Sequence, residues 1–393
     1  MAELSRRHGP LMFLKLGEVP TVVVSSAEMA EVVMKSKDLM FASRPRSVTL
    51  DVIGYGSGIG IIFAPYGDRW HQARKVCTME LLSVKQVKRM EGIRSEEVSN
   101  LLSSITTSIG TTVNLTEKLS ALMNDVIARA VFGGKCAQQG EYLRELEKVT
   151  ALVGGFSLVD LFPSSQLVRL LSSGERQMRR SYGRIQRIIS DIIEQRKEMR
   201  AAVSSNDEED LLDVLLRLHK EDSLPYALTL EAIGVIIFDL FAGGTETSGI
   251  TLEWAMSELL KNPENMRKVQ LEVRQVVGGQ QSVINNNDLH DLHYMRMVIK
   301  EVLREVQRDK HRHKGTHFEF TPFGAGRRQC PGMLFGTSTV EIALANLLHH
   351  FDWVIPDGPN PGSLDMSEKF GINVRRKFDL ELRAIPYVHS KAA

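Results

Sequence analysis

Residues Phe323 to Gly332 read Phe-Gly-Ala-Gly-Arg-Arg-Gln-Cys-Pro-Gly and stand directly before an apolar helical run from Met333 to His350. This spacing predicts that Cys330 lies at the entrance to a helix, where the positive end of the helix dipole lowers a thiol pKa and favours a thiolate. The glycines allow a tight turn that aims backbone amides at the sulfur. A single cysteine is more often an inert buried thiol. The full F-x-x-G-x-R-x-C-x-G spacing favours a metal-binding thiolate instead.

Composition narrows the class of protein around this segment. The chain has 393 residues, of which 43% are hydrophobic, enough to fill a large core. Its 49 basic and 48 acidic residues give a net charge of +1, which leaves no overall charge excess for binding nucleic acid. Cys77, Cys136 and Cys330 are too few and too scattered for a disulfide framework, and no C-x-x-C pair suggests zinc. A reducing compartment is therefore expected.

Hydrophobic periodicity predicts one domain in three parts. Residues 1–62 alternate apolar and β-branched residues between Gly and Pro breaks and form a β-rich N-terminal part. Residues 63–350 follow a helical period and form the core, which includes the cysteine loop at 323–332, and residues 351–393 form a C-terminal part of strands and loops. The longest apolar segment, from Thr229 to about Lys261, is expected to be a central buried helix of about 50 Å.

The cysteine segment resembles the cysteine-loop signature of cytochromes P450, and three further segments match that family in the same order. The resemblance implies a mainly helical P450 fold with a small β-rich subdomain, in which haem b (iron protoporphyrin IX) is bound by Cys330 as axial ligand of the iron. It also assigns cofactor contacts to Phe323, Gly326, Arg328 and Gly332, with the Arg328 guanidinium donating to a haem propionate.

The first two of these segments imply a haem contact and a proton relay. Trp70 and Arg74 stand four residues apart, share a helix face, and match the W-x-x-x-R pair that contacts a haem propionate in the family. Gly243 and Gly244 precede Glu246 and Thr247, which the resemblance makes the acid–alcohol pair that delivers protons to iron-bound oxygen. The paired glycines are expected to let the helix open locally. The alternative is a helix-packing notch in which Thr247 bonds its own backbone.

The third segment, Glu301-Val302-Leu303-Arg304, matches the E-x-x-R of the family, whose role is a buried ion pair that supports the haem pocket. Only eighteen residues (323 − 304 − 1) separate Arg304 from Phe323, several times fewer than in P450s. The family's second arginine is absent from this interval, and Arg308 or Arg312 is its only candidate replacement. An incompletely buried charge network is expected to cost several kcal/mol, so the folding of this chain is in question.

The leading interpretation is a plant-type monooxygenase of specialised metabolism, because phrases such as Phe63–Gly67 and Arg383–Pro386 resemble that clan. One atom of O2 would enter a small hydrophobic, terpenoid-like substrate, and NADPH–cytochrome P450 reductase would supply the electrons. Substrate contacts are expected from residues 45–62, from Ile237, Ala242 and Thr247, and from the turn at Phe370 and Gly371.

Three alternatives stay open: a truncated P450 that folds poorly or binds haem without turnover, a P450 that rearranges peroxides, and a haem-free helical binding protein. Retained Glu246 and Thr247 argue against peroxide rearrangement, which needs no proton relay. Members of the clan begin with a helix that anchors them to the cytosolic face of the endoplasmic reticulum membrane. No apolar run of that length follows Met1, so this chain is expected to be cytosolic or peripheral to the membrane.

Overall fold

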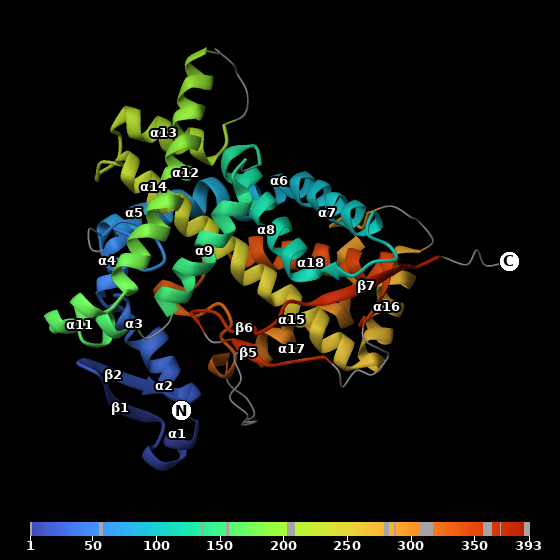
Figure 1. Cartoon of the computed structure of the whole chain (residues 1–393), viewed down its shortest axis with the longest axis horizontal. Helices are drawn as coiled ribbons and strands as arrows, with labels where there is room; N and C mark the ends of the chain where they lie inside the picture. Colours follow the sequence, from blue (N-terminus) through green and yellow to red (C-terminus); the bar gives the residue numbers. More distant parts are fainter. Residues whose placement is uncertain are drawn as a thin grey trace. The chain divides into compact units, whose positions relative to one another are not determined.

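The computed structural model describes residues 2–54, 58–135, 137–154, 157–202, 209–278, 283–286, 288–306, 317–356, 364–369 and 371–388. Helices dominate these residues and the strands are short, which confirms a mainly α fold with a small β content (Figure 1). The chain divides into two compact units, each assembled from separate stretches. Unit 1 comprises 1–78, 140–239 and 307–331, and unit 2 comprises 79–139, 240–306 and 332–393.

Unit 1 carries one hairpin and a series of helices. Its elements are α1 (Ala2–His8), β1 (Leu11–Leu16), β2 (Val19–Val24), α2 (Ala27–Glu31), the π-helix η1 (Val32–Ser36), α3 (Asp38–Phe41), α4 (Val48–Val52), α5 (Asp68–Cys77), α9 (Gln139–Gly154), α10 (Leu158–Leu161), α11 (Gln166–Leu171), α12 (Gly174–Ala202), α13 (Leu211–Glu221), α14 (Leu230–Phe241) and the 3-10 turns η6 (His317–Glu319) and η7 (Gly326–Arg328).

Unit 2 holds the remaining helices and most of the strands. Its elements are the π-helix η3 (Thr78–Leu82), α6 (Val84–Arg89), α7 (Glu91–Thr106), β3 (Val113–Asn114), α8 (Leu115–Phe132), the π-helix η4 (Ala242–Glu246), α15 (Thr247–Lys261), α16 (Pro263–Val277), the 3-10 turn η5 (Asp288–Asp291), α17 (His293–Val306), α18 (Met333–His350), β4 (Phe351–Val354), β5 (Glu368–Lys369), β6 (Arg375–Arg376) and β7 (Glu381–Pro386).

The N-terminal part contains less β-structure than the alternating pattern suggested. Among the residues of this part that the structure describes, β1 and β2 are the only strands, and they pair antiparallel with Leu11 opposite Val24. The described residues that follow β2 in this part are mainly helical, because Ser26 and Ser47 accept hydrogen bonds from backbone amides and so cap α2 and α4. The β-rich description of residues 1–62 therefore holds for the hairpin alone.

The central helix forms where the apolar segment predicted it. The run Leu230–Lys261 has 32 residues and is apolar enough to cross a membrane, but 72% of its apolar window is buried inside the protein. A mostly buried helix of this kind is a core element of a globular fold. The helical period changes at η4, where one turn has π geometry.

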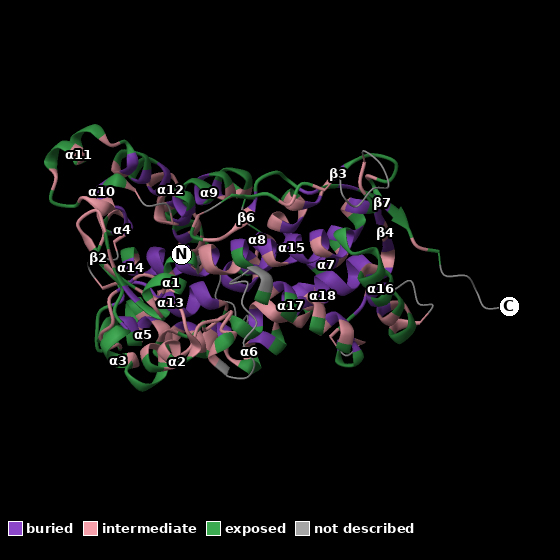
Figure 2. Ribbon diagram, turned by 90° about the horizontal axis from the view of Figure 1, so that it is seen from below, coloured by how far each residue is buried: buried purple, intermediate pink, exposed green. Residues whose placement is uncertain are grey.

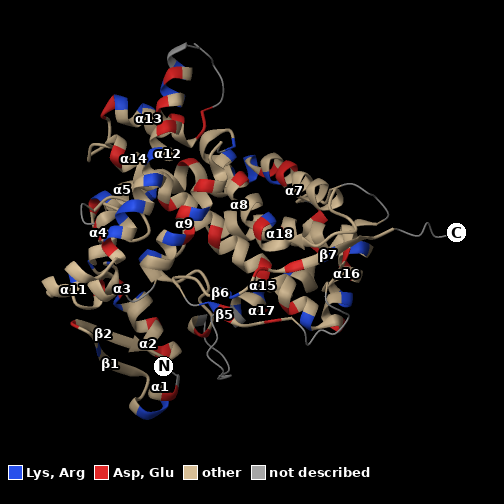
Figure 3. Ribbon diagram, viewed as in Figure 1, with Lys and Arg blue, Asp and Glu red and all other residues tan. Residues whose placement is uncertain are grey.

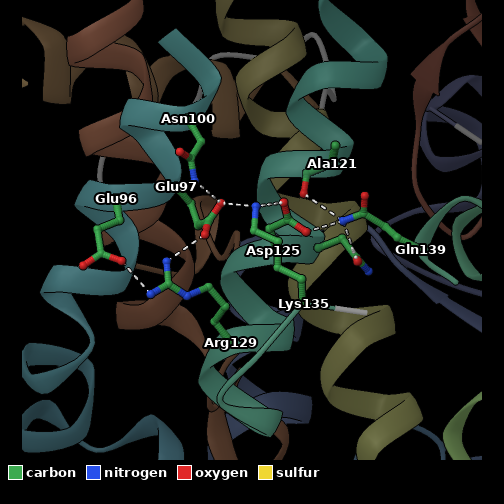
Figure 4. A network of polar contacts seen from close by, with 9 residues as sticks. Glu96, Glu97, Asn100, Ala121, Asp125, Arg129, Lys135 and Gln139 are labelled. Atoms are coloured by element: carbon green, nitrogen blue, oxygen red, sulfur yellow. Dashed lines mark hydrogen bonds and ion pairs between the residues drawn. The ribbon is translucent and has the colours of Figure 1, made fainter. Parts of the chain in front are cut away.

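The core of unit 2 lies along α7, α8, α15 and α18, where Figure 2 shows buried residues concentrated. A polar network also ties α7 to α8 (Figure 4). The carboxylate of Glu97, with 2% of the side chain exposed, accepts from Arg129 at 2.7 Å and from Lys135 at 2.7 Å. Burial raises the pKa of Glu97, but hydrogen bonds from Lys135, Asn100 and Arg129 outweigh it and lower that pKa overall.

The C-terminal part adds two small sheets to unit 2. Strand β7 is central in a sheet of order β3-β7-β4 with antiparallel pairing on both sides, and β5 pairs antiparallel with β6. The helix α18, which directly precedes β4, has the bounds predicted from the sequence, Met333 to His350.

Candidate active site

The cysteine loop is held in a tight turn against the N-terminal part of unit 1. The Cys330 amide donates to the Phe323 carbonyl at 2.8 Å, which closes the loop, and the Cys330 side chain is exposed. Gly326 has φ +64°, and a Cβ added there would overlap the carbonyl oxygen of Met34 and lie 3.1 Å from its carbon. Only glycine fits at this position. Gly332, also predicted to contact the cofactor, is the N-cap of α18.

Arg328 fastens this loop to the preceding chain. Its Nε donates to the Ala42 carbonyl at 2.6 Å and its Nη2 to the Ala64 carbonyl at 2.5 Å. The guanidinium also stacks 4.3 Å from the ring centroid of Trp70, whose own indole N–H donates to the Ile61 carbonyl at 3.0 Å. The single N–H of Trp70 is therefore in use, so in this structure Trp70 supports Arg328 and does not itself offer a donor to a propionate.

Three guanidinium groups gather beside the loop. Arg74 Nη2 donates to the Gln329 carbonyl, and Arg44 Nε donates to the Ile62 carbonyl at 3.2 Å. Desolvation, and then the positive charges of Arg44 and Arg74, lower the pKa of Arg328 to about 10. Desolvation also lowers the pKa values of Arg44 and Arg74, although for Arg74 the Cys330 sulfur acts in the opposite direction. The cluster is therefore electrostatically strained.

This cluster suits the propionate groups of a haem. Within the described part of the chain, no carboxylate pairs with Arg44, Arg74 or Arg328. Each guanidinium carries more N–H donors than its backbone contacts use. Grouped cations without a carboxylate partner favour an anionic ligand, and the exposed thiol of Cys330 lies in the same loop. The residues present thus fit an iron porphyrin.

The second predicted segment forms the widened turn that its glycines suggested. The π-helix η4 covers Ala242–Glu246, and the Thr247 hydroxyl donates to the Gly243 carbonyl at 2.6 Å. Thr247 is exposed. A Cβ on Gly244 would lie 3.0 Å from Ile127 on α8, so this turn is also a close packing contact. The helix opens locally as expected, and both features of the packing-notch alternative are present, namely the close contact with Ile127 and the bond of Thr247 to its own backbone. The proton relay stays a prediction.

Glu246 is buried, with 7% of its side chain exposed, and is paired with residues near the end of the chain. Its carboxylate contacts the guanidinium of Arg375 and accepts from Asn373 Nδ2 at 2.9 Å. Sequence reasoning missed these two partners, because they lie more than 120 residues from Glu246 along the chain. The one signal that could have pointed to them is the double arginine Arg375-Arg376, which forms β6. Arg44 was missed in the same way.

The ion pair of the E-x-x-R segment forms but is not buried, which corrects the prediction. Arg304 Nε donates to Glu301 Oε2 at 2.8 Å, on α17, and the two side chains are 54% and 53% exposed. The desolvation cost expected for a buried pair falls accordingly. Arg308 and Arg312, the candidate replacements for a third partner, lie outside the described residues.

The predicted substrate contacts have mixed outcomes. Ile237 lies on α14 and has no exposed surface, so its assignment to a pocket wall is wrong for this structure. Helix α14 is buried all round at this level, which removes the one-sided face that the prediction assumed. Ala242 is half-buried at the start of η4. Phe370 lies outside the described residues.

Comparison with known proteins supplies the family. The sequence model of the cytochrome P450 family matches residues 1–308 and 305–377. The chain belongs to the cytochrome P450 family. Members of this family are haem monooxygenases, which makes this P450 an oxidoreductase that acts with a redox partner, a substrate and O2.

Several plant P450s are similar over nearly the whole chain. The desmethyl-deoxy-podophyllotoxin synthase of Sinopodophyllum hexandrum is 42% identical, covering 97% of this chain and 86% of the relative. The 5-epiaristolochene 1,3-dihydroxylase of Nicotiana tabacum is 37% identical, covering 100% of this chain and 89% of the relative. The germacrene A hydroxylase of Lactuca sativa is 37% identical, covering 97% and 88%. This chain is therefore a plant-type P450.

The comparisons also locate the shortened interval. The two matches to the family meet at residues 305–308, at the start of the interval that the sequence showed to be short. The alignment with the Sinopodophyllum synthase runs over 438 positions, although only 97% of the 393 residues of this chain take part in it. The synthase therefore has residues within the aligned region to which no residue of this P450 corresponds.

Proposed function

We propose that this chain inserts one atom of O2 into a small hydrophobic, terpenoid-like plant metabolite, with electrons that NADPH–cytochrome P450 reductase supplies. The observation that carries the proposal is the cysteine loop, in which an exposed Cys330 lies with three guanidinium groups that have no carboxylate partner among the described residues. Relatives whose names are hydroxylases of 5-epiaristolochene and germacrene A support the choice of substrate class.

Cys330 and the three nearby arginines would hold the cofactor at two places, the iron and the propionates. The Cys330 sulfur would ligate the iron, and Arg44, Arg74 and Arg328 would bind the propionates as charge-assisted donors. Phe323 and Gly326 fix the shape of the loop, through the closing hydrogen bond and the contact with Met34. The bound haem supplies the activation of O2, and the thiolate tunes its reactivity.

Thr247 and Glu246 would move the protons. The Thr247 hydroxyl lies on the open turn of the helix, where it is exposed and can donate once it leaves the Gly243 carbonyl. The adjacent Glu246 carboxylate is buried and hydrogen-bonded, and it can take up a proton and pass it on. A peroxide-rearranging P450 would have no use for this pair.

An apolar surface of unit 1 supports placement on the cytosolic face of the endoplasmic reticulum membrane. Strands β1 and β2 and helices α10 and α11 are mostly uncharged (Figure 3). Their turns are joined, because the Glu18 amide donates to the Leu161 carbonyl at 2.7 Å. Phe13 is 69% exposed and Leu170 75% exposed. Exposed apolar side chains gathered in this way are typical of a membrane-contacting face.

The test is the visible spectrum of the purified chain, reduced and exposed to carbon monoxide, because a strongly red-shifted Soret band reports the iron–thiolate bond. We expect the band in the wild type and its loss in Cys330→Ser, while Cys77→Ser keeps it, since Cys77 is fully buried in α5. NADPH-dependent oxidation with reductase then separates a monooxygenase from an inactive haem protein. Absence of the band, with a P450 of full-length interval as positive control, would establish the truncated, inactive alternative.

A further inference from the structure

The paired strands β5 and β6, together with the described residues 371–374 and Lys377 beside them, form a C-terminal hairpin. This hairpin contacts the helix that carries the proposed proton relay at several successive points. Asn373 and Arg375 both bind the carboxylate of Glu246. The residue between them, Val374, accepts through its carbonyl from the Trp254 indole N–H at 3.0 Å, two turns further along α15. Three successive residues of this segment therefore contact the helix.

A second charged contact fixes the register of the hairpin. Arg376, with 2% of its side chain exposed, donates through Nη1 to the Ser257 hydroxyl at 3.0 Å and lies 3.7 Å from Glu253 Oε1. Glu253 also accepts from the Thr116 hydroxyl at 2.6 Å. This contact anchors the hairpin without involving Glu246. The contact between Arg375 and Glu246 is therefore separate from it.

A buried carboxylate is stable as an anion only when it is paired and hydrogen-bonded. Glu246 meets this condition through Arg375 and Asn373, which also restrict it to one orientation immediately before Thr247. Loss of the guanidinium would remove the charged one of these two contacts and weaken the restriction on the carboxylate.

Resting on the proposed function, we infer that Arg375 is a positioning residue for proton delivery: it holds the Glu246 carboxylate in one orientation beside Thr247, with Asn373 as a second support. Monooxygenation converts substrate R–H, O2, two protons and two electrons into R–OH and water. When the protons arrive at the wrong place, the same O2, protons and electrons leave as hydrogen peroxide and R–H is unchanged. The ratio of product to peroxide therefore reports the position of the relay.

The experiment compares Arg375→Gln, Arg375→Lys and Glu246→Gln, with Lys377→Gln as a matched control, because Lys377 is an exposed cation on the same hairpin that contacts Phe378 instead. We expect Arg375→Gln to lower the product-to-peroxide ratio roughly tenfold, as for loss of a hydrogen bond to a charged group. Arg375→Lys should recover most of the ratio, and the haem content and carbon monoxide band should stay unchanged.

A measurement that needs no turnover tests the contact itself. Hydrogen–deuterium exchange of a peptide covering 371–380 should accelerate in Arg375→Gln and in Glu246→Gln, and the double variant should exchange no faster than the faster single variant. Independent, additive acceleration would overturn the pairing. An unchanged ratio in Arg375→Gln, or an equal loss in Arg375→Lys, would overturn the positioning role, whereas a wild type without the thiolate band would refute the proposed function.

Discussion

Substituting Gly326 by alanine should disrupt the cysteine loop, and the structure gives the size of the effect. Gly326 and Gly324 both have positive φ, +64° and +67°, so an alanine at either position costs about 1–2 kcal/mol of backbone strain. They differ in their surroundings. A Cβ at 324 would meet its nearest atom, the Arg328 carbonyl oxygen, at 3.9 Å, whereas a Cβ at 326 would overlap the Met34 carbonyl and lie 3.3 Å from Asp38 Cβ.

Relief of that overlap requires the loop to move away from Met34, which adds about 1–3 kcal/mol for an overpacked site. We therefore expect Gly326→Ala to lower the free energy of unfolding by about 2–5 kcal/mol, and Gly324→Ala by about 1–2 kcal/mol. Because the total stability of a domain is about 5–15 kcal/mol, the first loss is large enough to reduce the folded, haem-binding fraction.

The assay is urea unfolding followed by far-ultraviolet circular dichroism, together with the ratio of Soret to protein absorbance after haem is added. Gly324→Ala should retain most of the Soret absorbance, and Gly326→Ala should lose most of it. If the two variants lose equal stability and equal haem, the loop does not pack on Met34 and the reasoning is refuted.

Two further outcomes follow from buried and bonded groups. Burial raises the pKa of Glu145, but hydrogen bonds from Lys148, Ser181 and Arg184 outweigh it and bring that pKa from 4.5 to about 2. The ionised side chain thus contributes at most about 3 kcal/mol to the free energy of unfolding, a contribution that is present above pH 4.5 and lost as the pH falls towards 2. Urea unfolding should show that Glu145→Gln is less stable than the wild type at pH 7 and that the difference in stability narrows at pH 3. A difference that does not depend on pH would contradict this. Thr247→Ala should keep haem and release peroxide in place of product. Thr251→Ala loses a comparable hydroxyl-to-carbonyl bond of 2.9 Å one turn later and should still form product. An equal ratio of product to peroxide in both variants would remove Thr247 from the relay.

Features that depend on short stretches of sequence were predicted well. The bounds of α18, Met333 to His350, follow from an apolar run after a glycine-rich turn, and the opening at η4 follows from Gly243 and Gly244. Both are local, because helix periodicity and glycine conformation are set by neighbouring residues.

Features that depend on contacts between distant residues were not predicted from the sequence. The exposure of Glu301 and Arg304 is determined by which segments cover α17, and the spacing of the two charges carries no such information. Ile237 was assigned to a pocket because helical periodicity does not reveal that a helix is enclosed on every side. Arg375 could not be matched to Glu246 because each of the 49 basic residues could pair with any of the 48 acidic ones, and only the fold selects a partner.

The guanidinium cluster links the proposed haem site to the stability of the protein. Arg44, Arg74 and Arg328 are fixed by bonds to backbone carbonyls, so their mutual repulsion is part of the folded state before any ligand binds. If these arginines bind the haem propionates as proposed, a dianionic porphyrin would neutralise this repulsion, and its binding to the folded state alone would shift the folding equilibrium towards that state. Supply of haem in the cell would then control the amount of folded protein as well as its activity, through three arginines beside the cysteine loop.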